Sequence, residues 1–210
     1  MTNQQSPATK STSTAQNILI RVEALTVQKA NQVICQMPEM SVTQGERVGI
    51  TGSNGSGKTT LLRVLAGLEQ NFAGLCDVPT ARIERVFVHQ TPFLFNGTVL
   101  DNVEFGLKAR SIAKSERRER AMSWLKRLGL TDLAHRAARS LSGGEGRRTA
   151  LARACVLHPE LLLLDEPLAD LDPNGIDCVL QSLSHLPNST ILISSPKPLP
   201  AELVNRTIEL

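Results

Sequence analysis

Apolar residues follow two different spacings along the chain. Short alternating or continuous apolar runs predict strands at residues 18–22, 33–34, 40–42, 47–51, 86–88, 161–164 and 190–194. Apolar residues at helical spacing predict one helix over residues 58–66, which ends at Gly67, and another that begins at Asp172 and Pro173. The leucines at 161–164 are typical of a central parallel strand that is covered on both faces. Strands that alternate with helices predict an α/β fold with a parallel sheet.

The segment that begins at Thr98 lacks strand patterns for about forty residues. Thr98 stands where it can cap one helix, and Ser115 stands where it can cap a second helix that ends at Gly129. The charged residues of the second helix alternate in sign, which is typical of a solvated helix face. The sequence therefore predicts a helical insert within the α/β fold, at about residues 97–155.

Composition indicates a soluble globular protein, because 41% of the residues are apolar and 20% are charged. Residues 1–16 differ from the rest, since they contain no large apolar side chain after Met1. Burial cannot offset the entropy cost of ordering such a segment. We therefore expect a disordered tail at 1–16, followed by one domain over residues 17–210.

Charge and cysteine usage exclude several classes of protein. The net charge of +3 includes no dense basic block, so we expect no nucleic-acid partner. The cysteines lie far apart and form no CxxC pair, which argues against a zinc module or a disulfide framework and favours a reducing, cytoplasmic compartment. The longest aliphatic run, at 161–164, is far shorter than the roughly 20 residues that cross a bilayer. Any role at a membrane would therefore need a partner protein.

A phosphate-loop pattern occupies the turn between a predicted strand and a predicted helix. It reads Gly52-Ser53-Asn54-Gly55-Ser56-Gly57-Lys58-Thr59. The glycines let backbone N–H groups surround phosphate oxygens, and the helix N-terminus adds partial positive charge. Lys58 can reach the β- and γ-phosphates, and the Thr59 hydroxyl can bind Mg²⁺. A flexible turn with a solvated lysine is the structural alternative, and the flanking strand and helix favour nucleotide binding.

Two acids, Asp165 and Glu166, follow the leucine strand directly. They are expected at the carboxyl edge of the sheet, where ligands of open α/β folds bind. Asp165 can hold Mg²⁺, and Glu166 can act as a general base on an attacking water. The alternative is that both acids only end a strand at the surface; a phosphate loop in the same chain favours the functional interpretation.

A third motif, Leu141-Ser142-Gly143-Gly144-Glu145, precedes a helix rich in small and basic residues. Ser142 and Glu145 have the spacing of a capping box, which alone would be structural. Two glycines in the first turn lower helix propensity but expose backbone N–H groups to an anion. Together with GSNGSGKTT and LLLLDEP, this motif resembles the ATP-binding-cassette (ABC) ATPases over roughly residues 18–195.

The resemblance implies a P-loop NTPase with a parallel-sheet core, a small antiparallel β-subdomain and a helical signature subdomain. It implies ATP and Mg²⁺ as cofactors, with the nucleotide held by residues 52–60, including Thr60, and the metal held by Thr59, Gln90 and Asp165. Gln90 matches the family's Q-loop glutamine and Glu166 its catalytic base.

Pairing of two cassettes is a second implication of the resemblance. In the family, two chains pair head to tail, and each ATP lies between one phosphate loop and the other chain's Ser142, Gly143 and Gly144. Asp172 matches the last aspartate of the D-loop, which lies across this interface.

The resemblance further implies the ATPase subunit of a membrane transporter, lying on the inner face of the cell membrane against a transmembrane permease subunit. Residues 92–95, Pro-Phe-Leu-Phe, are a candidate docking patch for that permease; core packing of the helical insert is the alternative. Two other functions remain open: a slowly hydrolysing, nucleotide-gated regulator, and an ABC ATPase that does not act in transport.

The sequence departs from the family pattern at four places. Ser195 stands where the family has its switch histidine, so we expect slow hydrolysis or a substitute group. Residues 27–30 contain no aromatic ring to stack on adenine, which predicts weaker and less selective nucleotide binding. The stretch from residue 74 to 86 is short, which predicts a lost strand or hairpin, and Gly146 replaces a usual polar residue.

Overall fold

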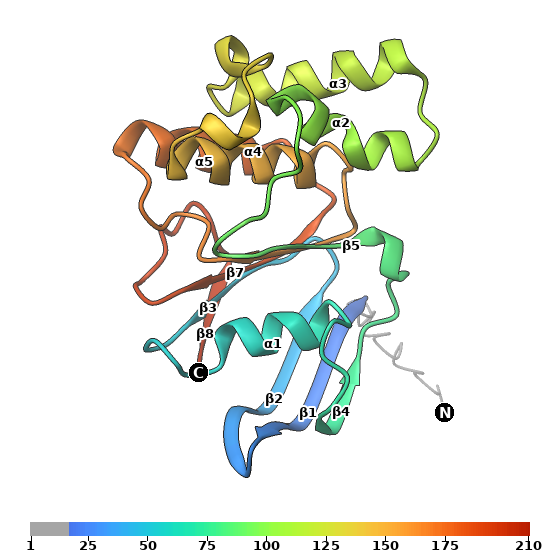
Figure 1. Cartoon of the computed structure of the whole chain (residues 1–210). Helices are drawn as coiled ribbons and strands as arrows, with labels where there is room; N and C mark the ends of the chain where they lie inside the picture. The colour runs from blue at the N-terminus through green and yellow to red at the C-terminus, as the bar shows by residue number, and fades with distance from the viewer. Residues whose placement is uncertain (1–16) are drawn as a thin grey trace, which may run out of the picture.

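The computed structural model describes residues 17–210 of the chain (Figure 1). The predicted disordered tail at 1–16 lies outside the described residues. The described part contains a five-stranded sheet and a three-stranded sheet, with helices between and above them.

The five-stranded sheet is parallel and has the order β5-β6-β7-β3-β8. Its strands span Arg85–Val88 (β5), Leu161–Asp165 (β6), Thr190–Ser195 (β7), Arg47–Thr51 (β3) and Arg206–Glu209 (β8). Strand β6 is buried along its whole length, which confirms the prediction of a covered inner strand. Strand β5, predicted at 86–88, is only half-buried, because it forms one edge of the sheet. Strand β8, at the other edge, is mostly exposed and the apolar pattern does not predict it.

The three-stranded sheet is antiparallel, with the order β2-β1-β4. Its strands span Gln32–Thr43 (β2), Ile18–Lys29 (β1) and Ala73–Asp77 (β4). The prediction of two short strands at 33–34 and 40–42 is wrong, since both belong to one continuous strand, β2. Pro38 interrupts the pattern but not the strand, because β2 lies at the sheet edge, where a missing N–H is tolerated.

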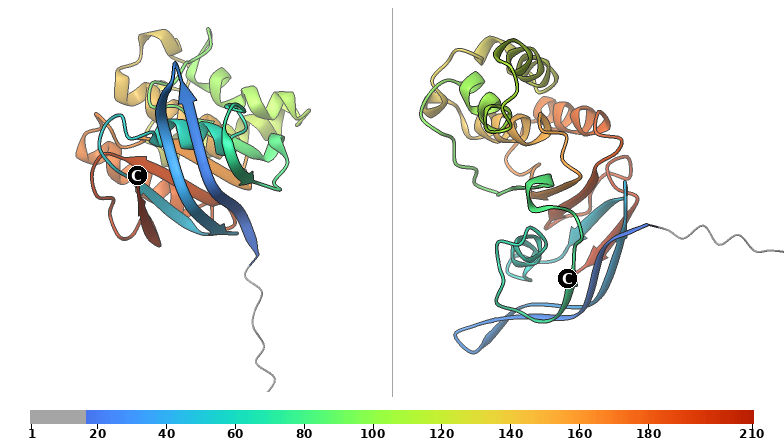
Figure 2. Two further views of the ribbon diagram at one scale, coloured as in Figure 1. Left: turned by 90° about the horizontal axis from the view of Figure 1, so that it is seen from below. Right: turned by 90° about the vertical axis from the view of Figure 1, so that its right-hand side faces the viewer.

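The helices cover the parallel sheet on both faces (Figure 1, Figure 2). Helix α1 (Lys58–Leu65) lies between the parallel and the antiparallel sheet, and one apolar core joins all three. Helices α4 (Gly143–Cys155) and α5 (Pro173–Ser184) lie on the opposite face. Helices α2 (Val99–Ala109) and α3 (Lys114–Arg127) pack above them and share the second apolar core. Three short 3₁₀ helices complete the list: Arg82–Glu84, Thr131–Leu133 and Ala138–Ser140.

Most of the predicted helix boundaries that depend on capping residues are confirmed. Thr98 caps α2 in a capping box with Asp101, and Asp172 caps α5. Gly129 follows α3 with a positive φ of 66°. The prediction that Ser115 caps α3 is wrong, because the Ala113 carbonyl already accepts the first helical hydrogen bond, from the N–H of Arg117 at 2.9 Å.

No helix in residues 17–210 combines the length and the apolar character that crossing a membrane requires.

Candidate functional site

The phosphate loop joins β3 to α1 in a conformation that requires glycine at two positions. Gly52 has a φ of +145° and Gly57 a φ of +101°. A Cβ atom on Gly52 would lie 2.3 Å from the Leu210 carbonyl oxygen, and one on Gly57 would lie 2.5 Å from the Ile34 carbonyl oxygen. Strands β8 and β2 therefore hold the loop from two sides, and no larger residue fits at either position.

Lys58 is buried within this loop, with an exposed fraction of 5%. Its Nζ donates hydrogen bonds of 2.8 Å to the carbonyl oxygens of Gly52 and Ser53. The Ser56 hydroxyl is also buried and has no hydrogen-bond partner within the described residues. Burial raises the pKa of the neighbouring Cys35 thiol to about 11, so this thiol is neutral and adds no negative charge beside the loop.

A cavity of about 360 Å³ opens at the N-terminus of α1. It is lined by residues of the phosphate loop and by three residues from other elements: Ile34, Asn54, Gly55, Gly57, Lys58, Thr59, Thr60, Gln90 and Glu166. Helix α1 has no side-chain cap, so its first N–H groups stay available. A lysine, free amides and an unpartnered hydroxyl together fit an anionic phosphate group.

Asp165 ends β6 beside this cavity and is almost fully buried. The Thr59 hydroxyl donates to Asp165 Oδ2 at 2.9 Å, and the Ser194 hydroxyl donates to Oδ1 at 2.7 Å. Mg²⁺ prefers oxygen ligands and is usually held by one or two carboxylates together with substrate phosphates. Thr59 and Asp165 offer such a donor set, and these residues therefore fit the metal.

Glu166 and Gln90 also line the cavity and contact each other there. The Gln90 side-chain amide donates to Glu166 Oε2 at 2.9 Å. The Glu166 backbone adopts a positive φ of 48°, and its N–H donates to the Ser194 hydroxyl at 3.0 Å. The structure thus brings the predicted residues Lys58, Thr59, Gln90 and Glu166 around one cavity.

The predicted residues of the third motif lie elsewhere. Ser142 caps α4 in a capping box with Glu145, and Gly143 is exposed with open space around it. Neither these residues nor Gly144 and Asp172 line the phosphate-loop cavity. Within the described residues, the third motif and the phosphate loop therefore form two separate surfaces of one chain.

Ser195 also lies outside the phosphate-loop cavity. It ends β7 opposite Thr51 and lines a neighbouring cavity of about 370 Å³ that it shares with Glu166. The hydroxyl of Ser195 accepts a hydrogen bond from the Lys197 N–H at 3.1 Å. The serine thus lies near Glu166, and its hydroxyl is bonded to the Lys197 N–H and not to the phosphate loop.

Two side chains that the sequence does not single out contribute to the site. Ser194 bonds both acids, and only its position at the end of a buried strand signals this role. Arg147, from α4, donates to the Gln90 carbonyl oxygen at 3.2 Å and forms an ion pair with Asp170 at 2.9 Å. The next residue, Arg148, is also an arginine, so the pattern alone does not distinguish Arg147.

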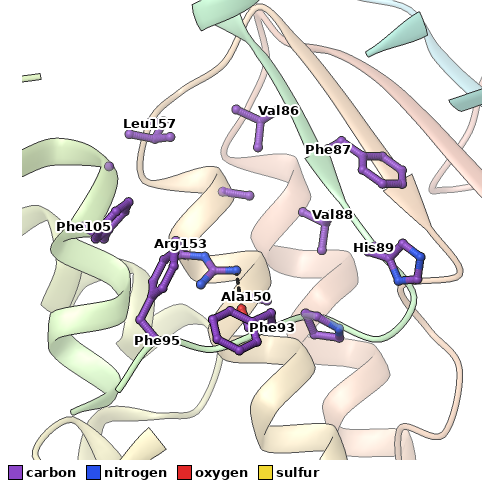
Figure 3. Close-up of a pocket in the computed structure, with 13 residues that line it drawn as sticks. Val86, Phe87, Val88, His89, Phe93, Phe95, Phe105, Ala150, Arg153 and Leu157 are labelled. Carbon is purple, nitrogen blue, oxygen red and sulfur yellow. Dashed lines mark hydrogen bonds between the residues drawn. The ribbon is translucent and has the colours of Figure 1, made fainter. Parts of the chain in front are cut away.

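An aromatic groove of about 430 Å³ lies beside the segment that follows Gln90 (Figure 3). Phe93 is 74% exposed and Phe105 is 52% exposed, and both line the groove. Phe95 stacks on Phe105 with ring centroids 4.3 Å apart, and the Arg153 guanidinium lies 5.0 Å from the Phe95 centroid. The alternative that residues 92–95 pack in the core is therefore wrong for Phe93, and the groove is an open apolar surface.

Comparison with known proteins shows the family to which the chain belongs. The ABC transporter family model matches residues 35–169, which include the phosphate loop, Gln90, the third motif and both acids. The chain belongs to the ABC transporter family. Asp172 and Ser195 lie beyond the matched range.

Similar proteins include subunits named for the import of inorganic ions. The Fe(3+) ions import ATP-binding protein FbpC of Rhizobium etli is 41% identical over 157 residues, which cover 70% of this chain and 44% of that protein. The tungstate uptake system ATP-binding protein TupC of Peptoclostridium acidaminophilum is 33% identical over 165 residues, covering 76% and 77% of the two chains. This ABC protein thus spans less than half the length of the iron-related proteins that it matches.

Solved structures show the same fold. The dimeric structure of a bacterial ABC transporter cassette superposes with a TM-score of 0.82 at 27% identity, over 91% of this chain and 94% of that one. A component of the cbiONQ transporter complex from Clostridium perfringens superposes with a TM-score of 0.72 at 28% identity, over 86% and 79% of the chains. The described domain is therefore an α/β ABC cassette.

Proposed function

We propose that this chain is the ATP-binding and ATP-hydrolysing subunit of an ABC importer, and that it drives solute transport by closing and opening an ATP-bridged dimer. The observation that carries the proposal is the convergence of Lys58, the Thr59–Asp165 pair and the Gln90–Glu166 pair on one cavity. A structural lysine and two surface acids would not need to meet in this way.

The triphosphate of ATP would bind in the curve of residues 52–60, with Lys58 turning from the loop carbonyls towards the β- and γ-phosphates. Thr59, Asp165 and Gln90 would hold Mg²⁺, which when bound neutralises charge on the phosphate oxygens. Ser194 fixes the Asp165 carboxylate through its 2.7 Å hydrogen bond.

Hydrolysis would use Glu166 as the base. A water molecule attacks the γ-phosphorus, Glu166 accepts a proton from that water, and the bond to the bridging oxygen breaks to release ADP. In the structure the Glu166 carboxylate is held by the Gln90 amide at 2.9 Å, so Gln90 would set its orientation.

The second half of the ATP site would come from Ser142, Gly143 and Gly144 of another copy of the chain. Gly143 is exposed at the N-terminus of α4, and no atom lies within 4 Å of the place where its Cβ would be, so the surface is open to a partner. The high similarity to a cassette whose structure is described as dimeric supports a homodimer. Asp172, which caps α5, would lie at the same interface.

The aromatic groove would receive a short helix of a transmembrane permease subunit (Figure 3). Exposed aromatic rings around a concave surface are typical of the energetic centre of an interface. The protein would then lie on the cytoplasmic face of the membrane. The related subunits are named for Fe(3+), tungstate and molybdate import, and we propose an inorganic ion as the cargo class.

A second candidate function is a nucleotide-gated regulator that hydrolyses ATP slowly. It is favoured by Ser195, whose hydroxyl accepts from the Lys197 N–H and which does not line the phosphate-loop cavity, and by the absence of an aromatic residue at 27–30. Phosphate release from Mg-ATP, measured for the wild type and for Glu166→Gln, separates the two functions. Release that the substitution abolishes supports the transport ATPase, and release absent from both proteins supports the regulator. Equal release from both would overturn the role of Glu166.

A further inference from the structure

The side chain of Arg147 connects two loops that flank the Gln90–Glu166 pair. Arg147 lies on α4, and its side chain is 17% exposed. Its Nε donates to the Gln90 carbonyl oxygen at 3.2 Å, and its Nη1 donates to the Ala169 carbonyl oxygen. Its Nη2 lies 2.9 Å from a carboxylate oxygen of Asp170. One guanidinium thus binds acceptors on both loops that flank Glu166.

Both loops bear directly on Glu166. Gln90, whose carbonyl oxygen accepts from Arg147, donates its side-chain amide to Glu166 at 2.9 Å. The Ala169 N–H donates to the Glu166 carbonyl oxygen at 3.2 Å, closing the turn that follows the acid. Arg147, Gln90 and Glu166 also line one small pocket. Movement of Arg147 would therefore shift both Gln90 and Glu166.

The turn that Arg147 holds is strained. Glu166 and Asp170 both have positive φ values, 48° and 54°, in a conformation that side chains other than glycine adopt at a cost. A strained turn persists only where its surroundings hold it. Helix α4 supplies such support through Arg147, which contacts both the Ala169 carbonyl oxygen and the Asp170 carboxylate.

Arginine suits this position better than another cation. Its planar guanidinium presents five N–H donors in a fixed fork, whereas a lysine presents one compact ammonium at the end of a flexible chain. Three acceptors on two different loops can be held together by the fork. A lysine retains the charge but cannot keep all three contacts.

We propose that Arg147 is a positioning residue for ATP hydrolysis, which aligns Gln90 and Glu166 by tying both of their loops to α4. The proposal rests on the proposed role of Glu166 as the base. Arg147 does not line the phosphate-loop cavity, so its removal should affect the hydrolytic step and not nucleotide binding. This separation distinguishes positioning from a general structural role.

The test compares Arg147→Gln and Arg147→Lys with the wild type, and uses Arg118→Gln, an exposed arginine on α3, as the matched control. The measurements are kcat and KM for ATP, the Kd of a fluorescent ATP analogue, and the melting temperature. Because a misplacement of about 1 Å can cost about 100-fold in rate, we expect Arg147→Gln to lower kcat at least ~10-fold. The Kd should stay within about twofold of the wild type, Arg147→Lys should lose less kcat, and Arg118→Gln should change nothing.

Three results would overturn the inference. Arg147→Gln could keep the wild-type kcat, it could weaken nucleotide binding as much as it lowers kcat, or Arg147→Lys could be fully active. If Arg147→Gln does not fold, the kcat and Kd of Arg147→Lys decide alone. Glu166→Gln, measured in parallel, separates the two proposals: an active Glu166→Gln variant removes the proposed base, whereas an inactive one beside a fully active Arg147→Gln removes only the role of Arg147.

Discussion

Two glycine-rich helix N-termini in this chain differ in how completely they satisfy their own backbone. Helix α1 has Gly57 at its N-cap, no side-chain cap, and the buried Lys58 in its first turn. Helix α4 has a full capping box, in which Ser142 Oγ accepts from the Glu145 N–H and the Glu145 carboxylate accepts from the Ser142 N–H at 2.7 Å. The first end is open to an anion, and the second has already used the N–H groups of Ser142 and Glu145 in its own capping box.

This difference explains why the two helix ends would play different parts in binding an anion. The end of α1 combines free amides with a cation, so it can bind phosphate within one chain. The end of α4 carries a carboxylate and lies on an exposed surface, so it would contribute only as part of a shared site. A dimer in which the N-terminus of α4 completes the partner's phosphate site is consistent with the open end of α1 and with the exposed end of α4.

The largest expected effect is the loss of the cation at α1. Lys58→Ala should weaken ATP binding about 100-fold or more, because charge-assisted hydrogen bonds to phosphate are among the strongest in proteins. Titration of a fluorescent ATP analogue measures it. Ser142→Ala is the control at the other helix and should leave binding to the isolated chain unchanged. Wild-type affinity in Lys58→Ala would argue against the phosphate-loop assignment.

Replacing a glycine by alanine should also change the stability of the fold differently at the two helix ends. Gly57→Ala places a Cβ 2.5 Å from the Ile34 carbonyl oxygen at a φ of +101°, and should destabilise the fold by about 2 kcal/mol or more. Gly143→Ala meets nothing within 4 Å in a helical position, and should stabilise α4 by up to about 1 kcal/mol. Urea unfolding of both variants tests the comparison. Equal destabilisation by the two substitutions would contradict it.

The smallest expected effect is a pH dependence of stability at the capping box of α4. Hydrogen bonds from Ser142, the backbone N–H first, hold the pKa of the Glu145 carboxyl below its usual value. A carboxyl with a lowered pKa stabilises the folded state above its unfolded pKa, and this contribution is lost as pH falls through the folded pKa.

Glu145→Gln tests this dependence, because it keeps a cap acceptor and removes the titration. The difference in unfolding free energy between wild type and variant should shrink as the pH falls below about 4.5. Glu145 is only partly buried, so solvent screening keeps the expected change small. A difference that is constant from neutral to acidic pH would contradict the assignment.

The sequence predicts the core of the fold because its central strand is uniformly apolar. The run of leucines at 161–164 alone predicts strand β6, which the structure extends to Asp165, and the carboxyl end of this buried strand places both acids beside the phosphate loop. Strand β8 escapes prediction because its side chains are mostly exposed, so pairing with β3 rather than apolar burial holds it in the sheet. Ser115 shows the limit of capping rules, because α3 begins at Lys114 with Ala113 at its N-cap and no side-chain cap, so the type of residue alone does not mark where a helix begins.

The site is predicted where a motif fixes the spacing and is missed where contacts join distant segments. Lys58 and Thr59 follow from one continuous pattern. Ser194 is 29 residues from Asp165 in the chain, and Arg147 is 57 residues from Gln90, so no local pattern marks either contact. Parallel strands bring Asp165 and Ser194 to one edge of the sheet, and α4 brings Arg147 to Gln90, so only the three-dimensional structure shows these contacts.

The most direct measurement of the central claim is the mass of the Glu166→Gln variant in solution, with and without saturating Mg-ATP, by light scattering. Because the variant would keep its binding groups while losing the base, ATP should convert a 22.8 kDa chain into a stable dimer. The double variant Lys58→Ala/Glu166→Gln should stay monomeric. A Glu166→Gln protein that binds ATP and remains monomeric would contradict a nucleotide shared between two copies of the chain.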